Sequence, residues 1–279
     1  MADVSVTIPA LNAAQFIGLQ LDALARQVGA PDFEVVVADN GSTDDTTAVA
    51  ARWVDRLNIH LVDASDRRGV SHARNVAIRA STGRLVLVCD ADDVVGECWV
   101  AAMVEGLATL DLVGGPVRLD RINASLALSW RSLSFPSDRL PAYDNYWPYV
   151  IGCNCGFRRH VFDALNGFDD DIPSGDDVDF AWRARIAGFE LGFAPNALVD
   201  YRMRSDLRSL YRQSVSRAQG DKLLYERFAI HGMERPQWTR PRLWWMATRA
   251  PLALLDARHR GLWVRQLGYL RSSLSRRAM

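Results

Sequence analysis

Short runs of apolar residues alternate with longer amphipathic stretches along the first 119 residues of the chain. The apolar runs predict strands at 4–9, 33–39, 59–62, 85–89 and 112–119. Apolar residues at helical spacing fill the intervals, at 12–29, 46–53, 69–80 and 96–110. The run at 85–89 contains no charged residue, which is typical of a strand buried on both faces. This alternation predicts an α/β fold with a doubly wound, mostly parallel sheet flanked by helices.

The alternation weakens after Leu119. Residues 120–149 mix serine, proline, tryptophan and tyrosine, and we expect a helical or irregular excursion at 124–133. Order then resumes, with strands expected at 150–157, 191–195 and 197–201 and helices at 159–165, 180–187 and 206–228. We therefore expect two halves of one domain, 1–119 and 120–228, followed by a helical extension at 229–279.

Carboxylates gather at three points of this plan. They are Asp39 after the second strand, Asp90, Asp92 and Asp93 after the fourth, and Asp176 and Asp177 before a helix. Each group has a structural explanation, since aspartate is favoured in turns and at helix N-termini. In a parallel sheet, however, Asp39 and Asp90 would share the edge where open α/β sheets bind ligands. Carboxylates gathered there need a cation or hydrogen-bond donors to offset their repulsion.

The residue types around this edge favour a metal–diphosphate site. A few hard carboxylate oxygens suit Mg²⁺ or Mn²⁺ shared with a diphosphate. Arg67, Arg68 and Arg74 can neutralise phosphate oxygens, and Gly69 precedes a helix whose first N–H groups favour anions. The sequence contains neither a P-loop nor a dinucleotide-binding fingerprint after the first strand, so a nicotinamide cofactor is not indicated.

Several short motifs carry a resemblance to a known family. In chain order they are Thr7-Ile8-Pro9-Ala10-Leu11-Asn12, Val37-Ala38-Asp39-Asn40-Gly41-Ser42-Thr43-Asp44, Arg68-Gly69-Val70-Ser71-His72-Ala73-Arg74-Asn75, Asp90-Ala91-Asp92-Asp93, Gly152-Cys153-Asn154-Cys155-Gly156-Phe157-Arg158-Arg159, Gly167-Phe168-Asp169 and Gly175-Asp176-Asp177-Val178-Asp179. Each motif is weak alone, but their order is specific. Over 4–228 the chain resembles the inverting glycosyltransferases of family 2, which implies the GT-A fold.

The resemblance implies a donor site in the first half of the domain. Pro9 and Asp39 would line the pocket for the nucleotide base and ribose. Arg74 would lie beside the diphosphate of a nucleotide-diphospho-sugar. Asp90 would contact the ribose or the sugar, and Asp92 would bind a divalent Mg or Mn cation.

The resemblance places acceptor chemistry in the second half. Asp177 matches the family's general base, and Asp176 would orient the acceptor. An inverting transfer needs a base on the acceptor hydroxyl, opposite the leaving diphosphate. The cation would act as a Lewis acid for that leaving group.

Two departures from the family pattern limit these expectations. A histidine that often follows the last strand as a metal contact is replaced here by Val199-Asp200-Tyr201-Arg202, in which Asp200 can serve as a further ligand of a hard cation. The segment Gln213–Arg217 lacks the Gln-x-x-Arg-Trp spacing of processive synthases. We therefore expect transfer of one or a few sugars, in the synthesis of a cell-surface glycan or glycolipid.

Two alternatives stay open. One is a catalytically silent module on the same fold that binds a sugar nucleotide or a glycan, although intact Asp92 and Asp177 argue against it. The other is a sugar-phosphate nucleotidyltransferase. Such an enzyme would need a glycine-rich, arginine-containing loop after the first strand, and residues 10–15 do not supply one.

Composition bounds the partners and the location. The formal net charge is zero, so nucleic acid is not an expected partner. The N-terminus lacks the features of a signal peptide and no apolar run reaches 18 residues, so we expect a cytoplasmic protein. Residues 235–279 nevertheless hold ten arginines and a single acid, Asp256. A basic amphipathic helix pair at 240–274 could contact the inner face of the cell membrane and a lipid-linked acceptor, or pack as a cap or an oligomer contact.

Overall fold

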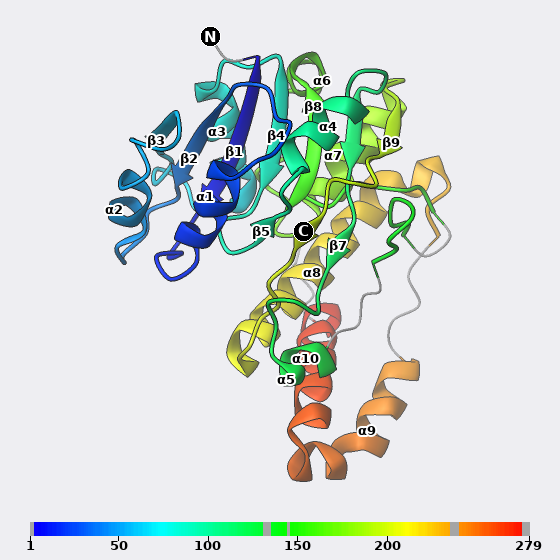
Figure 1. Cartoon of the computed structure of the whole chain (residues 1–279). Coiled ribbons are helices and arrows are strands. Elements are labelled where there is room, and N and C mark those ends of the chain that lie inside the picture. Colours follow the sequence, from blue (N-terminus) through cyan, green and yellow to red (C-terminus); the bar gives the residue numbers. More distant parts are fainter. Residues whose placement is uncertain (1–2, 131–134, 144–145, 235–239, 275–279) are drawn as a thin grey trace. The chain divides into compact units, whose positions relative to one another are not determined.

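The chain forms two compact units, each made from several segments. The computed structural model describes residues 3–130, 135–143, 146–234 and 240–274, without the side chains of 240–243 and 273–274. The sheet unit consists of residues 1–118, 135–171 and 176–201. The helical unit consists of residues 119–134, 172–175 and 202–279. Figure 1 colours both units along the sequence.

The sheet unit is built on a mixed sheet in the order β3-β2-β1-β4-β8-β6-β9. Its strands are β1 (Val4–Ala10), β2 (Phe33–Asp39), β3 (Ile59–Asp63), β4 (Leu85–Cys89), β6 (Leu112–Gly114), β8 (Asn154–Arg158) and β9 (Leu191–Phe193). Only β8 runs against the others, because it pairs antiparallel with both β4 and β6. The predicted doubly wound, mostly parallel sheet is therefore confirmed.

Helices cover both faces of this sheet (Figure 1). They are α1 (Ile17–Ala25), α2 (Thr46–Ala51), α3 (Val70–Ala80), α4 (Trp99–Gly106), α6 (Arg159–Leu165) and α7 (Asp176–Ile186). One core packs α1, α2 and α4 against inward residues such as Val6, Val35 and Leu87. On the other face, Val86 and Val88 meet α6 and α7. Alternate residues of one strand thus enter different cores, as the side-chain period of two requires.

The segment predicted as one strand at 112–119 is divided between two sheets. Leu112–Gly114 joins the main sheet as β6, whereas β7 (Val117–Arg118) pairs with β10 (Val199–Asp200), which also pairs with β5 (Val94–Val95). At Gly115 a Cβ atom would lie 2.0 Å from the carbonyl oxygen of Ala197. A glycine is therefore required where the chain leaves the main sheet. The second sheet was not predicted, because the pattern of apolar residues does not show which strands pair.

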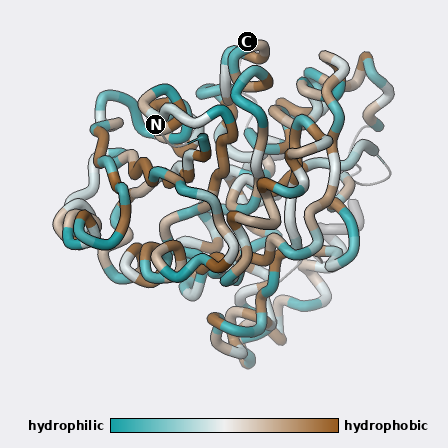
Figure 2. The backbone as a smooth tube through the Cα atoms, turned by 45° about the horizontal axis from the view of Figure 1, so that its top comes forward, coloured by the Kyte–Doolittle hydropathy of each residue, from teal (hydrophilic) through white to brown (hydrophobic). Residues whose placement is uncertain are grey.

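Other boundaries shift by a few residues. The strand predicted at 150–157 begins only at Asn154, and the helix predicted at 180–187 begins at Asp176, so that the acidic cluster forms its first turn. Three aspartates in that turn complement the helix dipole. Figure 2 shows the outer helices changing repeatedly between hydrophobic and hydrophilic colours, as expected of helices with one buried face.

The helical unit contains α5 (Ser125–Ser129), α8 (Leu207–Phe228), the 3₁₀ turn η1 (Ala229–His231), α9 (Arg240–Leu255) and α10 (Ala257–Leu274). Asp206 caps α8 by accepting a hydrogen bond from the N–H of Ser209 at 2.9 Å. Residues 172–175 belong to this unit because Gly220 of α8 lets the backbone of Ser174 approach, and Ser216 donates to the carbonyl of Pro173. The predicted C-terminal helical extension is thus present. Within the described part of the chain, no helix is long and apolar enough to span a bilayer.

Candidate active site

The end of β4 carries the first group of predicted site residues. β4 stops at Cys89, so Asp90 lies at the edge of the sheet where the apolar run ends. Its side chain keeps 27% of its surface exposed, and one carboxylate oxygen accepts a hydrogen bond from Arg74 at 2.9 Å. Asp39 ends β2 at the same edge, because β2, β1 and β4 are parallel and adjacent. The predicted convergence of these strand ends is present in the fold.

Arg74 ties the strand end to α7. It projects from α3, is 4% exposed, and its guanidinium donates to Asp176 at 2.7 Å as well as to Asp90. Burial alone would lower the pKa of Arg74, but the carboxylates of Asp176, Asp90 and Asp177 raise it well above its usual range. The guanidinium is therefore a permanent positive charge among three predicted site carboxylates.

Asp177 lies next to this charge on the first turn of α7. One of its oxygens accepts a hydrogen bond from the N–H of Gly152 at 2.7 Å, and the other accepts from the N–H of Val178 at 2.9 Å. Burial and the neighbouring Asp176 raise the pKa of Asp177 to about 6, against the lowering effects of Arg74 and the two N–H groups. A carboxylate with that pKa is ionised at neutral pH yet accepts a proton more readily than an ordinary aspartate.

Cys153 joins two of the carboxylates that follow β4, which was not predicted from the sequence. Ligand atoms of Asp90, Asp93 and Cys153 all lie within 4.8 Å of one another, with Asp93 and Cys153 buried. Cys153 lies near Asp90 because β8 pairs antiparallel with β4, with Asn154 opposite Cys89. Burial, together with Asp93 and Asp90, raises the pKa of the Cys153 thiol well above its usual range.

The two predicted metal ligands differ in their surroundings. Asp92 is partly exposed between the buried residues Ala91 and Asp93. Asp200 is 3% exposed in the second sheet, and both of its oxygens accept hydrogen bonds from the guanidinium of Arg118, at 2.5 and 3.0 Å. A cation would have to compete with Arg118 for Asp200, so Asp92 is the more accessible of the two ligands.

The predicted nucleotide contacts, Pro9 and Asp39, lie beside loops that are held by hydrogen bonds. Pro9 is buried on β1, and both oxygens of Asp39 accept from the N–H of Ser42 at 3.2 Å. Asn40 holds the loop after β3 by donating to the carbonyls of Ala64 and Arg67 at 2.6 and 2.7 Å. Asn40, which the sequence reasoning missed as an organiser, thus shapes the rim around Asp39.

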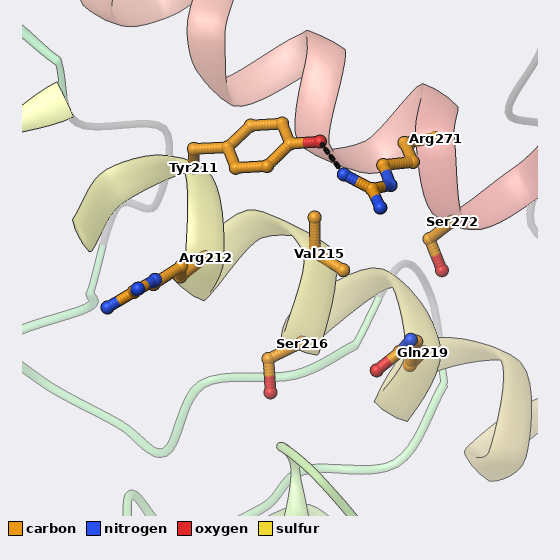
Figure 3. A pocket seen from close by; sticks show the side chains of 7 residues that line it. All are labelled: Tyr211, Arg212, Val215, Ser216, Gln219, Arg271 and Ser272. Atoms are coloured by element: carbon orange, nitrogen blue, oxygen red, sulfur yellow. Dashed lines mark hydrogen bonds between the residues drawn. The ribbon is translucent and has the colours of Figure 1, made fainter. Parts of the chain in front are cut away.

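The helical unit contains a separate pocket of about 470 Å³ between α8 and α10. Figure 3 shows Tyr211 of α8 and Arg271 of α10 joined by a hydrogen bond of 3.1 Å at its rim. No predicted site residue lines it. We therefore assign the candidate active site to the carboxylates of the sheet unit.

Comparison with known proteins places this site in a family context. A family model described as glycosyl transferase family 2 matches residues 5–165, which include Arg74 and Asp90 but end before Asp177. Glycosyltransferase AglE of Haloferax volcanii is 30% identical over 199 residues, covering 70% of this chain and 65% of that protein. The succinoglycan biosynthesis protein ExoO of Rhizobium meliloti is 26% identical over 273 residues, covering 91% and 77%.

A PGL/p-HBAD biosynthesis glycosyltransferase of Mycobacterium tuberculosis is 36% identical over 170 residues, covering 59% of this chain and 62% of the relative. The chain thus spans slightly less than two thirds of the archaeal and mycobacterial relatives.

Solved structures share the fold. The mannosyltransferase PcManGT of Pyrobaculum calidifontis, solved with GDP-Man and Mn²⁺, aligns with a TM-score of 0.67 at 23% identity, covering 98% of this chain and 86% of its own. TarS 1–349 of S. aureus aligns with a TM-score of 0.58 at 18% identity, covering 99% and 93%. The expected GT-A type fold is confirmed by these likenesses.

Proposed function

Because the chain belongs to glycosyl transferase family 2, we propose that it transfers a sugar from a nucleotide-diphospho-sugar to an acceptor hydroxyl with inversion. The observation that carries this proposal is the arrangement around Arg74. A carboxylate with a raised pKa, Asp177, lies beside a buried guanidinium that also holds Asp90 at the sheet edge. Because Arg74 bonds Asp176, the residue before Asp177, one side chain connects the turn that carries the proposed base to the proposed donor-binding edge.

In the proposed reaction, Asp177 takes the proton of the acceptor hydroxyl. The acceptor oxygen forms the new bond to the anomeric carbon while the bond to the diphosphate breaks on the opposite face. The N–H of Gly152 fixes one oxygen of Asp177, so the base is oriented before substrate binds. Asp176 is engaged by Arg74, and we propose that it positions the base and the acceptor rather than removing a proton.

We propose that Arg74 also contacts the nucleotide-sugar. Its Nε atom is buried and has no hydrogen-bond partner among the described residues. A buried N–H group without a hydrogen-bond acceptor costs free energy unless a ligand supplies that acceptor. An oxygen of the donor's sugar or diphosphate is the group that the proposal places there. Asp39 and Pro9 would contact the base and ribose at the same edge.

The donor set around β4 fits a divalent cation. Asp90 and Asp93 offer hard carboxylate oxygens close together, and Asp92 adds a partly exposed one, which suits Mg²⁺ or Mn²⁺. The Cys153 thiol, with its raised pKa, stays protonated and is a poor ligand for such an ion. When bound, the cation would supply Lewis-acid stabilisation of the leaving diphosphate. Asp92 remains the first proposed ligand, and Asp200 is secondary because Arg118 occupies its oxygens.

A group of aromatic rings is formed by the segment before Gly152 and by α7. Tyr146 stacks on Trp147 with ring centroids 4.7 Å apart, and Trp182 of α7 packs edge-on against Tyr146. Tyr149 is only three residues before Gly152, which places it within about 10 Å of the Asp177 hydrogen bond. We propose that these rings border the acceptor, because aromatic faces pack well on sugar rings.

The proposed product is a glycan or glycolipid of the cell envelope, extended by one or a few sugars in the cytoplasm. The names of ExoO and of the mycobacterial relative, which refer to succinoglycan and PGL/p-HBAD biosynthesis, support this class of product. We place the donor site in residues 1–119 and the acceptor site in residues 120–228.

A donor screen tests the proposal. The full chain is mixed with individual nucleotide-sugars, with Mn²⁺ or Mg²⁺ and with chelator, and thermal unfolding is recorded. One nucleotide-sugar should raise the unfolding temperature only when the cation is present. The same mixture with glycan acceptors should then release nucleoside diphosphate, and the product anomer is read by nuclear magnetic resonance. Binding without any release would favour a silent binding module, and a long polymer would contradict the limited transfer.

A further inference from the structure

The outer face of α9 is apolar although it lies at the surface of the helical unit. Trp244, Leu252 and Leu255 are 71%, 39% and 83% exposed, and they recur at helical spacing along one side of the helix. Leu254, 80% exposed, extends this face at the end of α9. The opposite side of α9 is packed, since Met246 and Ala253 are 7% and 8% exposed. An apolar stripe that a soluble helix would bury is therefore turned outward.

The one polar side chain in the stripe is internally satisfied. Thr248 lies one turn after Trp244, and its hydroxyl donates to the backbone carbonyls of Trp244 and Trp245 at 3.0 and 3.1 Å. A hydroxyl bonded back to its own helix needs no partner from water. The stripe can therefore leave water without losing a hydrogen bond.

Positive charge flanks the apolar stripe where α9 (orange in Figure 1) turns into α10 (red). Arg260 donates to the carbonyls of Ala253 and Leu254, both at 3.2 Å, so its guanidinium lies beside the exposed leucines. Arg249 and Arg258 are also exposed. The only acid of residues 235–279, Asp256, is paired with His259. The turn thus combines exposed leucine side chains with a net positive charge.

We propose that the α9–α10 turn, defined by residues 244–260, is the part of this chain that docks on a membrane surface containing anionic lipid. The leucines would enter the boundary between headgroups and acyl chains, Trp244 would lie at the headgroup level, and the arginines would pair with phosphates. Two copies of the same turn would bring arginines face to face, which disfavours self-association as the explanation. A nucleic acid would leave the exposed leucines uncovered.

This docking would bring the enzyme to lipid-linked acceptors, but it does not depend on the proposed chemistry. Its test therefore uses binding alone. Vesicles of phosphatidylcholine, and of phosphatidylcholine mixed with phosphatidylglycerol, are floated through a density gradient with the full chain. Two variants accompany the wild type: Leu254→Glu combined with Leu255→Glu, and the control Ile230→Glu. Ile230 is 85% exposed on η1, outside the stripe, so the control adds one of the same carboxylates at an equally exposed apolar position, where the double variant adds two.

The wild type and the Ile230→Glu variant should float with the anionic vesicles. Binding to phosphatidylcholine alone, and binding of the double variant to either vesicle, should be weaker by at least about tenfold. Equal flotation of the wild type with both vesicles, or with neither, would overturn the proposal. So would a wild-type dimer in size-exclusion chromatography that the double variant converts to a monomer, because the face would then join two copies. The comparison of vesicles needs no variant and stands even if the double variant misfolds.

Discussion

The guanidinium of Arg74 donates a hydrogen bond to the carboxylate of Asp176 across 102 residues of sequence, at 2.7 Å. Its other terminal nitrogen reaches Asp90 at 2.9 Å. One buried side chain therefore spans from the edge of β4 to the first turn of α7. In our account, this link sets the position of the acceptor base relative to the bound donor.

Replacing Arg74 with lysine should break that link. A single ammonium group on a flexible stem cannot hold two carboxylates as a planar guanidinium does. We expect kcat/KM for transfer to fall by roughly 100-fold, and the protein to lose about 3 kcal/mol of stability because the buried carboxylate of Asp176 and the half-buried one of Asp90 no longer share a guanidinium. Arg79→Lys is the matched control, since Arg79 is an exposed residue of the same helix. Equal activity of the two variants would argue against the linking role.

Gly152 should tolerate no side chain. A Cβ atom at this position would lie 2.7 Å from both terminal nitrogens of Arg74. Gly152→Ala should therefore displace Arg74 and disturb the N–H that orients Asp177, which lowers kcat more than donor affinity. Isothermal calorimetry with the donor and steady-state kinetics separate the two effects. Gly18→Ala, where the nearest contact is an ordinary 3.7 Å, should leave both unchanged. Wild-type kcat in Gly152→Ala would contradict this reading.

Activity should depend on pH through Asp177. Because the base must be ionised, log(kcat/KM) should rise with pH below about 6 and level off above it. The contribution of Asp177 to stability should change in the opposite direction, falling as pH rises. The folded state binds the Asp177 proton more tightly than the unfolded chain, whose aspartate pKa is 3.8, so this carboxylate destabilises the fold as pH rises from about 4 through about 6.

Denaturant titration at pH 7.5 should therefore find Asp177→Asn more stable than wild type, by roughly 1–3 kcal/mol. The difference should shrink at pH 4, where the folded wild type is protonated at this site. A stability gain that is the same at both pH values would assign the effect to packing instead.

Substitutions of Asp92 and Asp200 should have different effects, because Asp200 is paired with Arg118. Asp92→Ala should weaken donor binding measured with Mn²⁺ and leave the weaker binding measured with chelator unchanged. Asp200→Asn should chiefly lower the unfolding temperature, because it breaks the pair with Arg118. If Asp200→Asn removed the metal dependence as fully as Asp92→Ala, Asp200 would be a ligand as the sequence suggests and the Arg118 pair would have to open.

Local pattern was sufficient for much of the fold. Mainly apolar runs located β1 and β2, and an uninterrupted apolar run located β4, whose end at Cys89 was marked by the following aspartate. Parallel order followed from the alternation of strands and helices. It brought Asp39 and Asp90 to one edge, as the strand pairing bears out.

Long-range register explains what the sequence did not reveal. Cys153 meets Asp90 and Asp93 only because β8 inserts antiparallel beside β4, with Asn154 opposite Cys89. The resemblance placed Arg74 beside a diphosphate, but its bonds to carboxylates depend on the packing of α3 and α7. Gly152 offered a local signal, since a glycine directly before Cys153 leaves room for a neighbour, yet nothing local names that neighbour as Arg74.

The central claim is that Asp177 removes the acceptor proton. The most direct measurement compares Asp177→Asn with wild type, in donor binding by calorimetry with Mn²⁺ and in transfer to the acceptor by product formation. Asparagine keeps an oxygen for the N–H of Gly152 but cannot take a proton. We predict donor affinity within about twofold of wild type and transfer reduced by at least about 10³-fold. Near-wild-type transfer by Asp177→Asn would contradict the account.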